Sequence, residues 1–401
     1  MTALTHVLRR ALPAAVLALG LALSFSSDAQ NDQGNGNGDG NGNGNGNNGN
    51  SYLQHNLVSD LAGVADHQDT NLKNSWGVFF NPNGPVWVAN NATGTSTLYD
   101  GKGIGFVPQN ATVPLVVTIP SVDGTGTGVP TGLTFNSSGD FAISAGPPPV
   151  PARFIFATED GVIAAWAGGT AAVKMYPLGN VNPTGAVYKG IALAGNGTAH
   201  FLYAADFHNK KIEVFDTTFT PVASFGGFTD PGIPPEYGPF NIMNINGTLY
   251  VAYAVKEEDG DDEVAGEGLG FIDAYDPNGA LLGRVASHGT LNAPWGMAIA
   301  PDGFGKFSNA LIVGNFGDGK IQGYDLVKGT PLGQLRDATN NVLAIDGLWG
   351  IQFGNGLLDQ PTTTLFFAAG PNGESDGLYG SLTATSPVPN PGGGHGHGKG
   401  H

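Results

Sequence analysis

The sequence predicts an all-β protein folded as a six-bladed β-propeller, and a repeated tripeptide is the main reason. Tryptophan, glycine and an apolar residue follow one another from Trp76, Trp295 and Trp349. Looser copies of this tripeptide lie between them and begin at Thr131, Lys189 and Phe240. The second residues of the six copies are separated by 55, 58, 51, 55 and 54 residues. A regular period of this length, made of short strands, is typical of propeller blades, so six copies predict six blades.

Each expected blade begins with an inner strand that contains the tripeptide, as at residues 75–80 and 294–300. Glycine at this place would let the inner strands approach one another closely around the axis of the propeller. The tryptophan before it can either pack its ring between blades or line a ligand pocket at the mouth of the channel. A turn rich in Asn, Asp, Pro and Gly follows the inner strand, because these residues readily adopt turn dihedral angles.

The second strand of each blade is a nearly continuous apolar run, which indicates burial on both faces between neighbouring blades. These runs occupy residues 86–89, 154–157, 201–204, 248–253, 311–313 and 365–368. Third strands alternate and often end with an aromatic residue before an acid, as at 98–100 and 273–276. A fourth strand is recognisable at 281–286 and 331–336. We therefore expect six equivalent four-stranded sheets.

One more strand is expected before the first blade. Residues 53–65 alternate loosely between apolar and polar side chains, and they precede the first copy of the tripeptide. Pairing of this N-terminal strand with the last blade would close the ring and remove both open sheet edges. Residues 66–74 are polar and are expected to form a loop that crosses to the axis.

The two ends of the chain differ in composition from the propeller at 52–386. Residues 1–29 have the pattern of a cleaved signal peptide, with Arg9 and Arg10 before an apolar stretch at 11–25 and a small-residue cleavage site at Ala29. This pattern predicts a secreted or periplasmic protein. Residues 30–51 form a Gly/Asn-rich linker and residues 387–401 a Gly/His-rich tail, both of a composition typical of disorder. No apolar run reaches the roughly 18 residues of a membrane span, so no transmembrane segment is expected.

The charge of the chain restricts its partners. It carries 16 Lys and Arg against 33 Asp and Glu, a net charge of −17, and it has no cysteine. Nucleic acids and anionic lipids bind basic surfaces, so neither is an expected partner. Disulfides cannot stabilise the fold, which therefore depends on the packing of blade against blade. We expect a monomer with an extracellular or cell-envelope ligand.

Several longer motifs resemble a known group of proteins. They are Asn-Ser-Trp-Gly-Val from Asn74, Ala-Pro-Trp-Gly-Met from Ala293, Gly-Asn-Phe-Gly-Asp-Gly from Gly314 and Gly-Leu-Trp-Gly-Ile from Gly347. The chain resembles an uncharacterised family of exported bacterial propellers, some of which carry a PEP-CTERM cell-surface sorting tail. More distantly, its blades are similar to NHL repeats, a six-bladed class. The resemblance covers roughly residues 56–385 and implies the fold without an activity. Residues 386–401 lack the Pro-Glu-Pro motif, so that route of surface sorting is not expected here.

Polar residues follow the second strands and predict a site on the axis. They are Asn90, Asn91, Glu159, Asp160, Asp206, Asn315 and Asn372. Carboxylate and amide oxygens that converge on one axis would suit Ca²⁺ or another divalent cation, with Asn90, Glu159, Asp206 and Asn315 as the ligands. Six-bladed lactonases of the gluconolactonase type use such a central metal to polarise an ester carbonyl, and the chain is similar to them in architecture and residue type only. The alternative is that these side chains bind backbone groups at strand ends.

Two other segments could bind cations. Six of the seven residues from Glu257 to Glu263 are acidic, which is typical either of a solvated loop or of a weak Ca²⁺ site. In the tail, His395, His397 and His401 are spaced by glycine and lysine and could bind Zn²⁺, Ni²⁺ or Cu²⁺. No nucleophile motif is present, and His208, two residues after Asp206, is the histidine nearest the predicted binding face; it is either a general base or an ordinary surface-loop residue.

These observations leave two functions open. The first is binding of a ligand or partner at the axial face formed by the second-strand loops, with Trp76, Trp295, Trp349 and Asn91 in the binding site. The second is a metal-dependent hydrolase or lactonase that uses the predicted central cation. The sequence identifies neither the ligand of the first function nor the substrate of the second.

Overall fold

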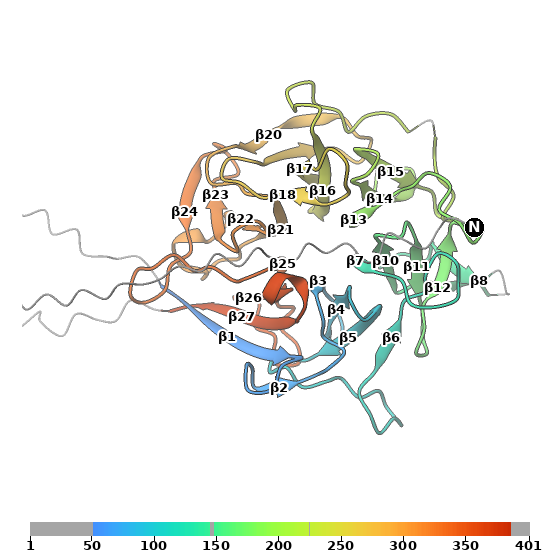
Figure 1. Cartoon of the computed structure of the whole chain (residues 1–401), viewed down its shortest axis with the longest axis horizontal. Coiled ribbons are helices and arrows are strands. Elements are labelled where there is room, and N and C mark those ends of the chain that lie inside the picture. The colour runs from blue at the N-terminus through green and yellow to red at the C-terminus, as the bar shows by residue number, and fades with distance from the viewer. Residues whose placement is uncertain (1–50, 145–147, 224, 386–401) are drawn as a thin grey trace, which may run out of the picture. The chain divides into compact units, whose positions relative to one another are not determined.

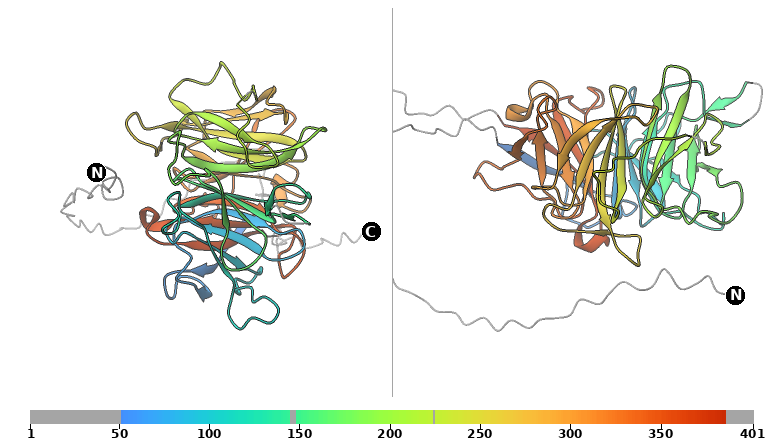
Figure 2. Two further views of the ribbon diagram at one scale, coloured as in Figure 1. Left: turned by 90° about the vertical axis from the view of Figure 1, so that its right-hand side faces the viewer. Right: turned by 90° about the horizontal axis from the view of Figure 1, so that it is seen from above.

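The computed structural model describes residues 51–144, 148–223 and 225–385, and in these ranges the chain is a six-bladed β-propeller. Six antiparallel sheets surround a common axis (Figure 1). Figure 2 shows the sheets of neighbouring blades packed face to face. The expected signal peptide at 1–29, the linker up to residue 50 and the tail at 387–401 lie outside the described residues. No helix in the described ranges is long and apolar enough to cross a membrane.

Each blade starts at the axis and ends at the rim. Blade 1 comprises β3 (Ser75–Phe80), β4 (Val86–Asn90), β5 (Thr95–Tyr99) and β6 (Val116–Thr118), and blade 2 comprises β7 (Pro130–Phe135), β10 (Phe154–Thr158), β11 (Ile163–Trp166) and β12 (Val173–Tyr176). Blade 3 comprises β13 (Tyr188–Gly195), β14 (His200–Asp206) and β15 (Lys211–Phe215).

The second half of the chain builds the other three blades. Blade 4 comprises β16 (Tyr237–Ile245), β17 (Thr248–Lys256), β19 (Phe271–Tyr275) and β20 (Leu281–Ser287), and blade 5 comprises β21 (Pro294–Ile299), β22 (Leu311–Asn315), β23 (Ile321–Tyr324) and β24 (Pro331–Gln334). Blade 6 comprises β25 (Leu348–Phe353), β26 (Thr364–Ala369), β27 (Leu378–Ala384) and β1 (Tyr52–Ser59). Short strands β2 (His67–Gln68), β8 (Ala142–Ser144), β9 (Val150–Pro151) and β18 (Glu263–Val264) lie in the connections.

The N-terminal strand closes the ring, as the sequence predicts. β1 pairs antiparallel with β27, from Tyr52 opposite Ala384 to Ser59 opposite Leu378. Tyr52 is buried between blades 5 and 6, where its hydroxyl donates a hydrogen bond of 3.0 Å to the Phe304 carbonyl. The strand ends at Ser59 rather than continuing to residue 65, because the next residues turn back and place β2 parallel to β1.

Blade 3 differs from the expected set of four-stranded sheets. After β15 the chain turns back, forms a bridge between Phe215 and Pro221, and the Val222 amide donates a hydrogen bond to the Val214 carbonyl. It then crosses to blade 4, where the Phe228 amide donates to the Gly279 carbonyl. Proline cannot donate a ladder hydrogen bond, and the aromatic residues that follow it pack between the two blades instead of extending a fourth strand.

Glycines in the tripeptides allow the inner strands to meet. A Cβ atom on Gly350 would lie 2.6 Å from the carbonyl oxygen of Trp76, and one on Gly296 would lie 2.6 Å from that of Trp349. Blade 4 has Asn241 in the equivalent place, and its side-chain amide donates a 2.7 Å hydrogen bond to the Trp295 carbonyl of blade 5. The pairing of every inner strand with its second strand is interrupted by a register shift at this point. Such bulges redirect side chains, here toward the axis.

Candidate functional site

The residue before the glycine of each tripeptide, or before Asn241 in blade 4, belongs to a buried layer across the axis. We call this set the axial layer; its members are Trp76, Thr131, Lys189, Phe240, Trp295 and Trp349. Rings from blades that are not neighbours touch, since the centroid of Trp76 lies 6.2 Å from that of Trp295 and the centroid of Phe240 lies 5.7 Å from that of Trp349. The axial layer therefore fills the channel at the level of the bulges.

The three tryptophans pack against one another, and the Phe316 ring stacks on Trp349. Trp76 and Trp349 are stacked with their rings 15° from parallel, and Trp295 stands nearly perpendicular to both. None of the three indole N–H groups has a hydrogen-bond partner among the described residues. Both expected roles remain open for Trp295, because it also borders a cavity described below. Contact of Trp76 and Trp349 with a ligand stays a prediction.

Lys189 is the one ionisable member of the axial layer, and its charge is paired. Its side chain is 1% exposed, and its Nζ lies 2.7 Å from Oε1 of Glu159. The other carboxylate oxygen of Glu159 accepts a 2.7 Å hydrogen bond from the Asn91 amide. The Lys189 ammonium also lies 5.0 Å from the centroid of the Trp76 ring. Burial alone would lower the pKa of Lys189, but Glu159 and nearby acidic groups outweigh that effect and raise it.

The acidic loop between β17 and β19 reaches the same end of the channel. Asp262 lies 3.9 Å from the Lys189 ammonium, and Asp261 lies 2.7 Å from the His208 ring and 3.4 Å from Lys256. Part of the loop is thus held by cations of the protein itself. Burial raises the pKa of Glu263 in this loop to about 7, although the charge of Lys189 opposes the shift.

The raised pKa of Glu263 has a measurable consequence for stability. Between about pH 4.5 and pH 7, the Glu263 carboxyl keeps its proton in the folded protein but has lost it in the unfolded chain. The contribution of Glu263 to stability therefore falls as pH rises through this window. We expect Glu263→Gln to raise the melting temperature more at pH 8 than at pH 5. Glu267→Gln, in the same loop but exposed, should have equal effects at both pH values. An equal rise in melting temperature for Glu263→Gln at both pH values would contradict the raised pKa of Glu263.

The structure brings Glu159 and Asn91 together, but it leaves the other predicted metal ligands within their own blades. Asn90 bonds to Ser75, Thr95 and Thr97. The Asp206 carboxylate accepts hydrogen bonds from Val187 and Asn209, and burial raises its pKa. Asn315 bonds to Thr290, Asn292 and Asp318.

The predicted metal sites therefore stay predictions. In the described ranges, no three side chains among His, Cys, Asp and Glu gather as a metal site would require. His395, His397 and His401 lie outside the residues that the structure describes. The predicted central site would need Asn90, Asp206 and Asn315 to exchange their present hydrogen bonds for a cation.

A cavity of about 400 Å³ lies on the other side of the axial layer. Second strands run antiparallel to inner strands, so the polar residues at their ends lie beside the starts of the inner strands. The cavity instead lies between the later halves of the inner strands, with the turn residues Pro82 and Ser137 at its border. We call it the axial cavity. It is at the opposite end of the channel from the predicted binding face.

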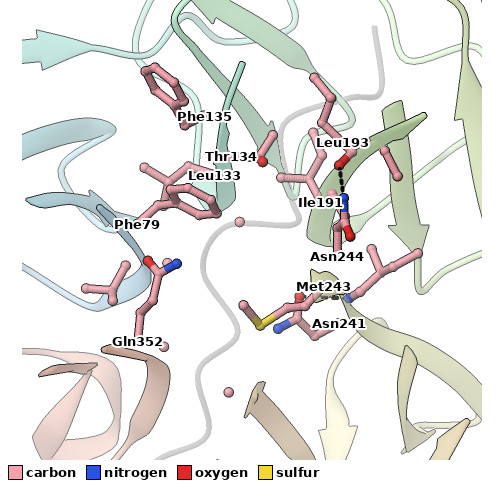
Figure 3. A pocket seen from close by; sticks show the side chains of 18 of the residues that line it. Phe79, Leu133, Thr134, Phe135, Ile191, Leu193, Asn241, Met243, Asn244 and Gln352 are labelled. Atoms are coloured by element: carbon pink, nitrogen blue, oxygen red, sulfur yellow. Dashed lines mark hydrogen bonds between the residues drawn. The ribbon is translucent and has the colours of Figure 1, made fainter. Parts of the chain in front are cut away.

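Residues from all six blades line the axial cavity (Figure 3). Its apolar side chains include Phe79, Leu133, Phe135, Ile191, Leu193 and Met243, and its polar side chains include Thr134, Ser138, His200, Asn241, Asn244 and Gln352. Among the described residues that line the cavity, only His200 is ionisable. Its Nδ1 lies 2.7 Å from the Asp140 carboxylate. Gln352 accepts a hydrogen bond from the Phe80 amide through Oε1, which leaves its Nε2 without a protein partner in the described structure.

Comparison with known proteins places the chain among viral relatives. No known protein-family model matches it. An uncharacterized protein of Acanthamoeba polyphaga mimivirus is 32% identical over 335 residues, which are 81% of this chain and 78% of the relative. A second uncharacterized protein of that virus is 32% identical over 338 residues, 81% of this chain and 84% of the relative. The chain belongs to the family of these mimivirus proteins. Membership of this family in an exported bacterial group, which the motifs suggest, stays a prediction.

Two solved structures are similar to this family member at low sequence identity. A protein of unknown function from Bacteroides thetaiotaomicron is 13% identical, with a TM-score of 0.50 over 83% of this chain and 76% of that one. Virginiamycin B lyase from Staphylococcus aureus is 16% identical, with a TM-score of 0.45 over 84% of this chain and 100% of that one. At 13% identity, the similarity to the Bacteroides protein concerns the fold alone.

Proposed function

We propose that this member of the family binds a small, uncharged and partly apolar molecule in the axial cavity. The observation that carries the proposal is the lining of that cavity, which combines apolar side chains with amides and hydroxyls. A volume of about 400 Å³ lies in the range of small-molecule sites. Aromatic and aliphatic walls with a few fixed polar groups are the usual composition of such sites.

The charge distribution favours a neutral ligand. The chain has a net charge of −17, yet none of the described residues that line the axial cavity is Asp, Glu, Lys or Arg. A charged ligand would lose its hydration there without a partner of opposite charge. A neutral ligand can instead place a carbonyl near the free Gln352 amide and its apolar part against Leu133 and Met243. Export, which residues 1–29 predict, would place such a ligand outside the cytoplasm.

Three probes of one shape and different charge test this proposal. Benzamide, benzoate and benzamidine are planar and nearly equal in size, so their binding to crystals and in calorimetry compares charge directly. We expect benzamide to bind in the axial cavity at millimolar concentration and the two ions to be excluded from it. Met243→Trp, which fills part of the cavity, should weaken benzamide binding at least about tenfold.

Two outcomes would count against binding of a neutral ligand. Tighter binding of benzoate or benzamidine than of benzamide in the axial cavity would contradict the proposal that its lining favours a neutral ligand. A divalent metal in stoichiometric amount in the purified protein, together with a lower melting temperature after chelation, would favour the metal-dependent hydrolase instead.

A further inference from the structure

A second cavity, of about 460 Å³, lies near the rim between blades 1 and 2. We call it the rim cavity. Its lining comes from the turn between β3 and β4, from Trp87, Leu98, Phe106 and Leu115 of blade 1, from Arg153 and Trp166 of blade 2, and from Leu357 and Leu358 of blade 6. The loop of blade 6 is attached to blade 1, because the Asn355 amide donates hydrogen bonds to the carbonyls of Asn81 and Gly84.

The rings of Trp87 and Trp166 form an aromatic wall of the rim cavity. The Trp87 ring lies 4.7 Å from that of Trp166 and 4.2 Å from that of Phe154, measured between centroids. Trp87 is 2% exposed, and its indole N–H has no partner among the described residues. Trp166 is only partly buried, and its indole N–H donates to the Gly169 carbonyl. The wall thus offers flat aromatic surface.

Arg153 borders the same cavity and has no partner for its charge. Its backbone is held in place, since its amide donates to the Trp166 carbonyl and its carbonyl accepts from Asn136. Its side chain is exposed. Every other Lys and Arg within the described ranges has an ion pair, a hydrogen bond or a ring contact, whereas no such contact involves the Arg153 guanidinium. In a chain with 33 acidic residues, Arg153 thus leaves a free guanidinium beside a mostly apolar cavity.

We propose that the rim cavity binds a small aromatic acid. The carboxylate would pair with the Arg153 guanidinium, whose planar fork of N–H donors matches carboxylate geometry. The flat apolar part would pack against Trp166 and Trp87 and displace water from leucine side chains. This site is separate from the axial cavity and does not depend on the function proposed for it.

The occupant is a small molecule rather than a polymer. The volume is that of a typical small-molecule site, and one guanidinium matches one carboxylate. Polyanions such as nucleic acids need several cations, and the acidic surface of the chain would repel them. A cationic ligand would meet Arg153 with a charge of the same sign.

The probe that tests the rim cavity is 2-naphthoate, with 2-naphthamide as its neutral counterpart. Calorimetry with the full chain should show that naphthoate binds more tightly than naphthamide. Arg153→Gln should weaken naphthoate binding at least about tenfold, because it removes a charge-assisted pair, and leave naphthamide binding nearly unchanged. Lys328→Gln, which removes the same charge from an exposed position in blade 5, should alter neither affinity.

A crystal structure with 2-naphthoate completes the test. We expect the naphthalene ring beside Trp166 and the carboxylate beside Arg153. The proposal is overturned if the parent protein does not bind naphthoate, if Arg153→Gln binds it as tightly as the parent, or if the acid occupies the axial cavity and is lost in Met243→Trp. Because Met243→Trp affects the axial cavity alone, failure of one site is distinguishable from failure of the other.

Discussion

Replacing Gly350 with alanine should lower the free energy of unfolding by about 3 kcal/mol, a large effect for one methyl group. The new Cβ would lie 2.6 Å from the Trp76 carbonyl oxygen and 2.9 Å from the Val78 amide nitrogen. Both atoms belong to the backbone of the inner strand of blade 1, so neither can move aside as a side chain could. Urea unfolding followed by circular dichroism measures the loss.

Gly139→Ala is the matched control for this substitution. A Cβ at Gly139 would meet no atom within 4 Å. This variant should stay within about 0.5 kcal/mol of the parent. If both alanine variants were equally stable, close approach of the inner strands would not be the reason for glycine in the tripeptide.

Removing the charge of Glu159 should have a comparable effect. Glu159→Gln leaves the Lys189 ammonium, which is 1% exposed, without its nearest counter-charge. Loss of one partner from a buried ion pair typically costs about 3–5 kcal/mol, and we expect the lower end because Glu159 is 25% exposed and Asp262 remains 3.9 Å away. The free energy of unfolding in urea again provides the measurement.

A second substitution tests whether the loss of stability in Glu159→Gln comes from the unpaired charge of Lys189. Lys189→Met added to Glu159→Gln should recover most of the lost stability, because an apolar side chain of similar length fits the axial layer. Asp359→Asn provides the exposed control, since its ion pair with Lys102 lies at the surface and should contribute less than about 1 kcal/mol. A double variant as unstable as Glu159→Gln would show that Lys189 acts through something other than its charge.

Much of the fold could be predicted because its cause is repeated along the chain. The glycine at the start of each inner strand is required wherever two backbones meet, so it recurs in five blades, and Asn241 replaces it through one specific hydrogen bond. Closure by β1 was also predictable, since an alternating segment before the first blade can pair only with the last blade. Blade 3 has no fourth strand among its described residues, because residues 216–223 and 225–236 lead across to blade 4, a path that no repeat specifies.

The binding sites were harder to predict because they depend on how the channel is filled. Alignment of the second-strand ends identified Glu159 and Asn91, which do meet. It did not identify Lys189, although the repeat itself contains a signal for it: lysine stands where other blades have tryptophan, phenylalanine or threonine. The axial cavity was missed because its lining comes from ordinary strand residues such as Leu133 and Ile191. Only their positions around the axis make them a pocket.

Pairing of β1 with β27 also determines when the protein can finish folding. Tyr52 is made early in synthesis, but Ala384, the residue opposite it, is made more than three hundred residues later. Until then β1 lacks its antiparallel partner and is bordered only by the short β2, and blade 6 lacks its outer edge. Contacts between such distant parts of a chain slow folding. A ribosome that stalls before β27 would therefore release a chain whose blades can form but whose ring stays open.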